Sequence, residues 1–190
     1  MIATPKISVV MPVYNADAFL NDAVESVLNQ SFRDFEFVIV NDGSSDKTCS
    51  ILEKYASEDD RIRIFHQENL GMIAALNRGC LMARGKYIAR MDADDISYSD
   101  RLKKQFVYLE RHPQVGILGT WIRKLKDGLP SESWCPPTDS KVLKWTLYFG
   151  VNVAHPSVLM RREIAEKLDF YRPDAAHSEE RDAWRLRGRS

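Results

Sequence analysis

The chain has 190 residues, of which 44% are apolar and 28% charged, as in a soluble globular protein of one domain with a sizeable core. Its 27 lysines and arginines balance its 27 aspartates and glutamates, which argues against a nucleic-acid partner bound by bulk charge. Three cysteines without a CxxC spacing, and no apolar run near the ~18 residues of a spanning helix, favour a cytoplasmic protein, with peripheral association at a membrane left open.

The first half of the chain alternates short apolar runs with amphipathic segments. Runs rich in β-branched and aromatic residues predict strands at residues 6–14, 35–42, 61–67 and 86–92. Apolar residues at helical spacing predict helices at residues 17–30, 45–58 and 72–85. Asp17 is the expected cap of the first helix, and Asp46 or Ser45 that of the second.

The second half is less regular. A helix is predicted at 99–113, stopping before Pro113, then a strand at 115–125 and a turn at 127–128. Residues 140–150 favour a helix, and residues 155–168 favour a short strand running into a helix. The whole pattern predicts an α/β fold, with a mostly parallel sheet, helices on both faces, and a smaller lobe from about residue 115.

The predicted strands end in distinctive polar segments. These segments are PVYN, NDGSSD, HQENLG and DADD, in chain order. Ligands of open α/β sheets bind outside the carboxyl ends of the strands, so we expect the four segments to meet on one side. The chain has neither GxGxxG nor GxxxxGK[ST], which leaves the common dinucleotide and Walker-type phosphate loops without support.

Three carboxylates crowd the segment after the fourth strand: Asp92, Asp94 and Asp95. In an extended segment Asp92 and Asp94 point to the same face, and their repulsion costs several kcal/mol unless a cation is present. Mg²⁺ or Mn²⁺ shared with substrate phosphates is the usual solution. Asp94 is then the expected ligand and Asp92 either a ligand or a ribose contact. In the alternative, Asp95 caps the next helix and the others are solvated.

Two further strand ends offer weaker signals. Asp42 could accept hydrogen bonds from a base or ribose, although such turns commonly only cap a helix. Gly71 allows either a close approach to a ligand or tight packing of a helix start on the sheet.

Two residues of the C-terminal part are further candidates. His155 is more readily a structural histidine than a metal or phosphate contact. Glu180 is either a general base or part of a charged helix face.

Taken together, PVYN, NDGSSD, NLGMIAALNRG, GKYIARMDADD, HPSVLMRR and EERDAW resemble the family 2 glycosyltransferases from about residue 6 to 184. The resemblance implies the GT-A fold and an inverting, metal-dependent transfer from a nucleotide-sugar donor, most readily a UDP-sugar. It implies Mn²⁺ or Mg²⁺ at Asp94 and a general base at Glu180. The implied nucleotide-sugar-binding residues are Pro12, Tyr14, Asn15, Asp42, Gly71 and Asp92.

The C-terminal part departs from the family pattern. Glu180 stands where an aspartate is usual, and the basic RLRGRS follows Trp184 where an apolar helix is common. We therefore expect a donor-binding half over about 1–110 and a short acceptor-side half over about 111–190, within one domain.

Two functions stay open. One is a transferase acting on a glycan or lipid-linked acceptor in polysaccharide or cell-envelope glycan synthesis. The other is a catalytically impaired or truncated nucleotide-sugar-binding module. A nucleotidyltransferase is disfavoured, because no glycine-rich basic loop follows the first strand.

Overall fold

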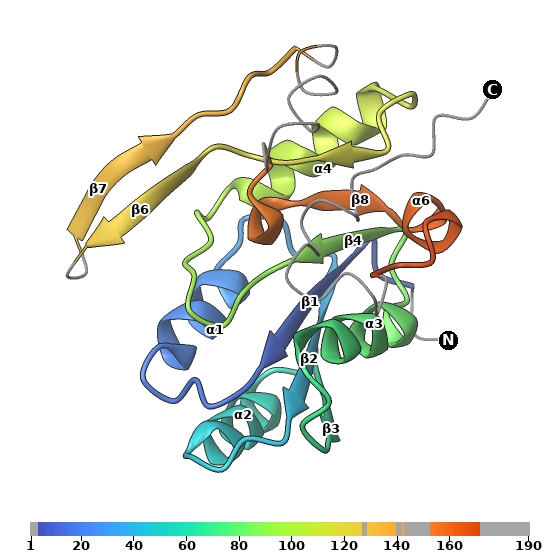
Figure 1. Cartoon of the computed structure of the whole chain (residues 1–190). Coiled ribbons are helices and arrows are strands. Elements are labelled where there is room, and N and C mark those ends of the chain that lie inside the picture. Colours follow the sequence, from blue (N-terminus) through green and yellow to red (C-terminus); the bar gives the residue numbers. More distant parts are fainter. Residues whose placement is uncertain (1–3, 127–128, 140–141, 143–152, 172–190) are drawn as a thin grey trace.

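The computed structural model describes residues 4–126, 129–139, 142 and 153–171. Six strands form one sheet in the order β3-β2-β1-β4-β8-β5, and β6 and β7 form a separate hairpin (Figure 1). The strands are β1 (Ile7–Val13), β2 (Phe35–Asp42), β3 (Ile62–Gln67), β4 (Tyr87–Arg90), β5 (Ile117–Leu118), β6 (Ile122–Lys126), β7 (Leu129–Trp134) and β8 (Leu159–Arg161). The helices are α1 (Leu20–Leu28), α2 (Thr48–Glu58), α3 (Met72–Met82), α4 (Arg101–Arg111) and α6 (Arg162–Lys167), with a 3₁₀ turn, η1 (His155–Ser157).

The first four strands are mutually parallel, as predicted from the strand–helix alternation. β1 lies between β2 and β4, with Val9 opposite Phe37 and Ala89. Every residue of β1 and β2 is buried, because helices cover both faces of the sheet. β8 joins the other edge of β4 in the antiparallel sense. The predicted fold class, a mostly parallel α/β sheet, is confirmed.

The helices form two layers (Figure 1). Alternate side chains of β1, such as Val9 and Met11, pack in one core with the apolar faces of α1, α2 and α4. Val10 points the other way, into a second core with α3 and α6. Helix α3 lies so close to the sheet that a methyl group on Gly79 would overlap Val10. This tight packing holds α3 against the sheet, with its first residue, Met72, following the loop after β3.

The predicted helix caps are wrong, because the cap positions are Phe19 for α1 and Lys47 for α2, neither with a side-chain cap bond. Helix α1 begins at Leu20, because Asp17 lies in a preceding turn where its backbone N–H donates to the Asp46 carboxylate (3.1 Å). The other oxygen of Asp46 accepts the Thr48 N–H (2.9 Å) at the start of α2, as expected of a residue near a helix start. Asp95 caps no helix, since α4 begins only at Arg101.

The single strand predicted at 115–125 is also wrong. β5 and β6 belong to different sheets, and the chain turns away between them at residues 119–121. The Thr120 N–H donates to Ser157 Oγ (3.0 Å), and a side chain at position 119 would overlap Val153. The predicted strand and helix at 155–168 are confirmed as β8 and α6. The predicted turn at 127–128, and the helix at 140–150 apart from residue 142, lie outside the described residues.

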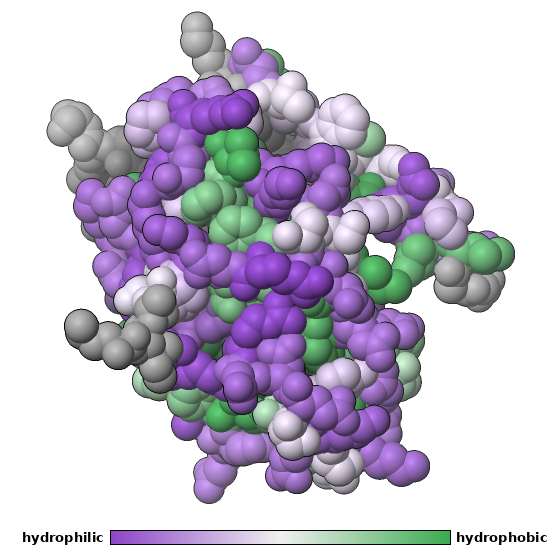
Figure 2. Space-filling view, turned by 180° about the vertical axis from the view of Figure 1, so that it is seen from behind, coloured by the Kyte–Doolittle hydropathy of each residue, from purple (hydrophilic) through white to green (hydrophobic). Residues whose placement is uncertain are grey.

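The β6–β7 hairpin, called the arm below, projects from the body of the molecule. Ile122 pairs with Trp134, and Lys126 with Leu129. Figure 2 shows the arm standing off the body with an opening between them. Within the part of the chain that the structure describes, no helix is long and apolar enough to cross a membrane.

Candidate active site

The polar ends of β1, β2 and β3 are joined by hydrogen bonds. The Asn15 side-chain oxygen accepts the Ser45 N–H (2.9 Å), and the Asn15 N–H donates to Ser44 Oγ (3.0 Å). The Asn41 oxygen accepts the Ser44 N–H (3.1 Å), which closes the turn after β2. Parallel strands have brought these loops to one edge, as the sequence predicted.

Asp42 is the last residue of β2 and lies among these loops. It is 3% exposed, and its carboxylate accepts three hydrogen bonds. The donors are the Gln67 side chain (2.6 Å), the Leu70 N–H (3.0 Å) and the Gly71 N–H (2.9 Å). Asp42 therefore fixes the path of residues 67–71 between β3 and α3. Sequence reasoning missed Gln67, whose role depends on a long-range contact that no local pattern displays.

Gly71 precedes α3 with a φ of +90°, a conformation that side chains disfavour. Open space surrounds the position where a Cβ would lie. Tight packing on the sheet therefore does not explain the glycine at position 71. The left-handed backbone lets the Gly71 N–H turn toward Asp42 while the helix start stays open to solvent.

The PVYN segment divides between core and surface. Pro12 is buried within β1, opposite Val40 of β2. Tyr14 is 52% exposed, and Asn15 follows with a left-handed φ of 47°. The part of this segment open to a ligand is therefore Tyr14 and Asn15.

The acidic cluster, Asp92, Asp94 and Asp95, follows β4 in a turn in which the Asp95 N–H donates to the Asp92 carbonyl (3.3 Å). Oxygens of the three carboxylates lie within 4.8 Å of one another. Asp94 is exposed, whereas Asp92 and Asp95 are half-buried. Burial, followed by the charges of Asp92 and Asp94, raises the pKa of Asp95 to about 6. Converging carboxylate oxygens fit the ligand preference of Mg²⁺ or Mn²⁺.

Two arginines, Arg90 buried and Arg101 half-buried, lie beside the cluster. The Arg90 guanidinium binds both oxygens of Asp92, at 3.0 and 3.1 Å. Arg101 donates to the backbone carbonyls of Pro156 (2.8 Å) and Arg90 (3.0 Å). The position of Arg90 could have been predicted from the sequence, because residues two apart in a strand share a face and Arg90 precedes Asp92 by two. The position of Arg101 could not, since only the packing of α4 places it beside the acidic cluster.

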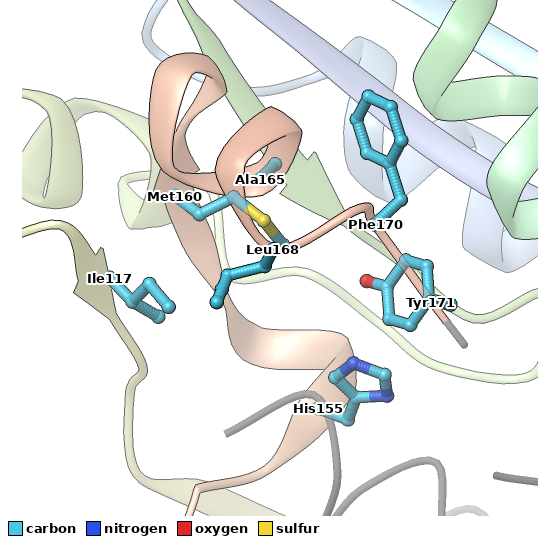
Figure 3. Close-up of a pocket in the computed structure, with 7 residues that line it drawn as sticks. All are labelled: Ile117, His155, Met160, Ala165, Leu168, Phe170 and Tyr171. Atoms are coloured by element: carbon cyan, nitrogen blue, oxygen red, sulfur yellow. The ribbon is translucent and has the colours of Figure 1, made fainter. Parts of the chain in front are cut away.

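His155 lies in the core of the molecule, which fits the structural interpretation. It is 2% exposed and packs edge-on against the Tyr171 ring, 5.1 Å between centroids, beside a small apolar pocket (Figure 3). Burial, assisted by the charge of Arg90, lowers the pKa of His155 to about 3, so the ring is neutral at physiological pH.

A cleft of about 1220 Å³ extends from the acidic cluster to the arm. Asp94 and Asp95 line one end, and Trp121 and Trp134 line the other. Trp121 is 60% exposed and Tyr98 66% exposed, so aromatic rings face the opening. Glu180, the expected base, lies outside the described residues, as do all residues after Tyr171.

Comparisons with known structures identify the same fold in solved glycosyltransferases. TarS 1–349 from S. aureus in complex with UDP superposes with a TM-score of 0.76 at 22% identity, over 93% of this chain and 53% of that one. The mannosyltransferase PcManGT from Pyrobaculum calidifontis, in complex with GDP-Man and Mn²⁺, gives a TM-score of 0.73 at 20% identity, over 96% of this chain and 51% of that one. The expected GT-A fold is confirmed.

Sequence comparisons agree. An uncharacterized glycosyltransferase of Methanocaldococcus jannaschii is 35% identical over 185 residues, which are 95% of this chain and 63% of the relative. The chain thus spans less than two thirds of that relative and about half of the solved chains. The family model for glycosyl transferase family 2 matches residues 8–169. The chain therefore belongs to glycosyl transferase family 2.

Proposed function

We propose that this chain is the donor-binding and catalytic part of a metal-dependent, inverting glycosyltransferase. It would move a sugar from a nucleoside-diphosphate donor to an acceptor hydroxyl. The observation that carries the proposal is the acidic cluster, whose three carboxylates converge within 4.8 Å beside the strand-end loops. Such a cluster is costly by itself and becomes favourable when a cation and a diphosphate bind together.

The nucleotide would bind along the ends of β1, β2 and β3. Tyr14 offers an exposed ring and Asn15 a backbone fixed against residues 44–45. Asp42 and Gly71 would shape the bordering loop, with Asp92 near the ribose. Support comes from proteins of the same fold, since crystals of TarS hold UDP or UDP-GlcNAc and PcManGT holds GDP-Man. We expect a UDP-sugar first, with GDP-sugars as the second class to test.

Asp94, the most exposed carboxylate of the acidic cluster, would be the direct ligand of Mn²⁺ or Mg²⁺. When bound, such an ion offsets the negative charge of a departing diphosphate. Asp92 and Asp95 would complete the oxygen-rich surroundings of the ion. The solved structure of PcManGT, which has the same fold, is a complex with Mn²⁺.

Glu180 would remove the proton from the acceptor hydroxyl as its oxygen attacks the anomeric carbon. The glycosyl–phosphate bond breaks on the opposite face, so the nucleoside diphosphate leaves and the configuration inverts. The acceptor, a glycan or lipid-linked saccharide of polysaccharide or cell-envelope synthesis, would enter the cleft between the acidic cluster and Trp121. Its place of action would be the cytoplasm or the inner face of the membrane.

A second candidate is a nucleotide-sugar-binding module without catalysis. The feature in its favour is the Glu179–Glu180 pair, which puts a glutamate at the position of the expected base. A base displaced by ~1 Å can lose about 100-fold in rate. Binding without turnover is therefore a distinct outcome.

Donor turnover separates the two candidates. Hydrolysis of UDP-glucose, UDP-GlcNAc and GDP-mannose would be followed with Mn²⁺ in the wild type, in Glu180→Gln and in the control Glu179→Gln. The transferase predicts nucleoside diphosphate release that Glu180→Gln reduces at least ~100-fold while donor binding persists. Donor binding with no turnover in any of the three proteins would establish the module instead.

A further inference from the structure

Arg90 ends β4 directly beneath the acidic cluster. Its side chain is 4% exposed and forms a two-pronged ion pair with Asp92, Nη1 to Oδ2 at 3.1 Å and Nη2 to Oδ1 at 3.0 Å. Two parallel N–H···O bonds fix both the distance and the plane of a carboxylate, which a single bond does not. Asp92 is thus oriented from below by a group that solvent does not reach.

Arg90 is itself held on several sides. Its N–H donates to the Val158 carbonyl (3.0 Å), and its carbonyl accepts a bond from Arg101 (3.0 Å). Nη2 also lies 3.7 Å from the sulfur of Met72, at the start of α3. Helix α3 therefore contacts the guanidinium group, while α4 and the segment before β8 hold the backbone of Arg90. The orientation of Asp92 is connected to the core through this group.

Charge and geometry predict opposite effects of Arg90 on a cation. Arg90 and Arg101 together offset two of the three charges of Asp92, Asp94 and Asp95, which by charge alone would weaken binding of a divalent ion. A fixed Asp92 strengthens binding, because the guanidinium sets the plane of the carboxylate before an ion arrives, so less conformational freedom is lost when the ion binds. Groups that orient metal ligands from behind typically contribute 10–100-fold to metal affinity.

We propose that Arg90 is a positioning residue of the donor site, whose two-pronged contact holds Asp92 in the orientation that receives the divalent cation. The inference rests on the proposed function, since it assumes that the acidic cluster binds that cation. Arg90 touches neither donor nor acceptor. It acts through Asp92.

The test is Arg90→Lys, which keeps the positive charge and removes the planar fork. Mn²⁺ affinity would be measured at saturating UDP by the loss of the free-Mn²⁺ electron paramagnetic resonance signal. Positioning predicts a Mn²⁺ affinity at least ~10-fold weaker than that of the wild type. The matched control is Arg61→Lys, which breaks another fork, to Asp59 (2.7 and 3.0 Å), remote from the acidic cluster.

A cycle with Asp92→Asn keeps the inference testable if Arg90→Lys lowers stability. If Arg90 acts through Asp92, adding Arg90→Lys to Asp92→Asn weakens Mn²⁺ binding by less than ~2-fold, so the two effects are not additive. Circular dichroism melting curves would verify that each variant is folded at the temperature of the titration.

The outcomes are distinct. Unchanged or tighter Mn²⁺ binding in Arg90→Lys, or fully additive effects in the cycle, would overturn the positioning role while leaving the proposed function intact. If the wild type itself binds neither UDP nor Mn²⁺, the proposed function fails as well, and the inference with it. A loss of Mn²⁺ affinity of at least ~10-fold in Arg90→Lys, absent from Arg61→Lys and not additive with Asp92→Asn, supports the positioning role.

Discussion

At the scale of single residues, the structure gives Asp42 a task that its motif does not display. The carboxylate that the sequence offers to a nucleotide is buried and accepts three hydrogen bonds from Gln67, Leu70 and Gly71. A buried carboxylate with this many donors is a strong local constraint, because each donor would otherwise lack a partner. In our account Asp42 supports nucleotide binding by fixing the loop between β3 and α3.

Asp42→Asn tests this role. The substitution replaces one acceptor oxygen by an NH₂ group that faces backbone N–H donors, so we expect a loss of about 1–3 kcal/mol in the free energy of unfolding. UDP affinity should fall as well. Urea unfolding and nucleotide titration would be compared with Asp34→Asn, where an exposed carboxylate accepts the Lys6 N–H (3.2 Å). Equal stability losses in the two variants would contradict the assignment.

At the scale of elements, a second polar network connects β1, β2 and β3 near their amino ends, away from the candidate site. Glu36 of β2 is 2% exposed and accepts bonds from Ser8 Oγ of β1 (2.6 Å), Arg63 of β3 (2.7 Å) and both the N–H and Nε of Arg84 (2.6 and 2.8 Å). Burial alone would raise the pKa of Glu36, but these hydrogen bonds outweigh it and lower the pKa below its ordinary value of 4.5. One carboxylate thus joins three strands and the loop after α3.

The lowered pKa has a definite consequence for stability. An acid whose pKa is lower in the folded state stabilises the fold above about pH 4.5, and this contribution is lost as the pH falls through the folded-state pKa. Glu36→Gln should cost about 2–4 kcal/mol at pH 7. Urea unfolding from pH 7 to pH 3.5 should show the gap between wild type and variant narrowing toward low pH. A gap that widens instead would refute the sign of the shift.

The same scale shows where sequence patterns suffice. Strands β1 and β2 are buried on both faces, and the helices that follow them, α1 and α2, have apolar stripes, so the parallel sheet was predictable. The division of residues 115–125 into β5 and β6 was not predictable. It depends on the close contact of Gly119 with Val153 and on the hydrogen bond from the Thr120 N–H to Ser157, and both partners are distant in sequence. The cap expected at Asp17 failed for the same reason, because Asp46 binds its backbone.

At the scale of the whole molecule, the two ends of the parallel strands differ in character. The amino ends of the strands are closed by Glu36 and its donors, whereas the carboxyl ends carry Asp42, the acidic cluster and the cleft that reaches the arm. Topology alone predicts this gathering of polar strand ends, which is why the candidate site could be located from sequence. The arginines beneath it, and the path of residues 67–71, depend on packing between distant segments.

The central claim is that the acidic cluster makes nucleotide binding depend on a divalent cation. Isothermal titration of UDP and GDP, with and without Mn²⁺, would compare the wild type with Asp94→Ala and with the control Asp60→Ala, an exposed acid elsewhere. We predict that Mn²⁺ strengthens binding of one nucleotide at least ~10-fold in the wild type and in Asp60→Ala, but not in Asp94→Ala. An equal Mn²⁺ effect in Asp94→Ala, or no nucleotide binding under any condition, would contradict the account.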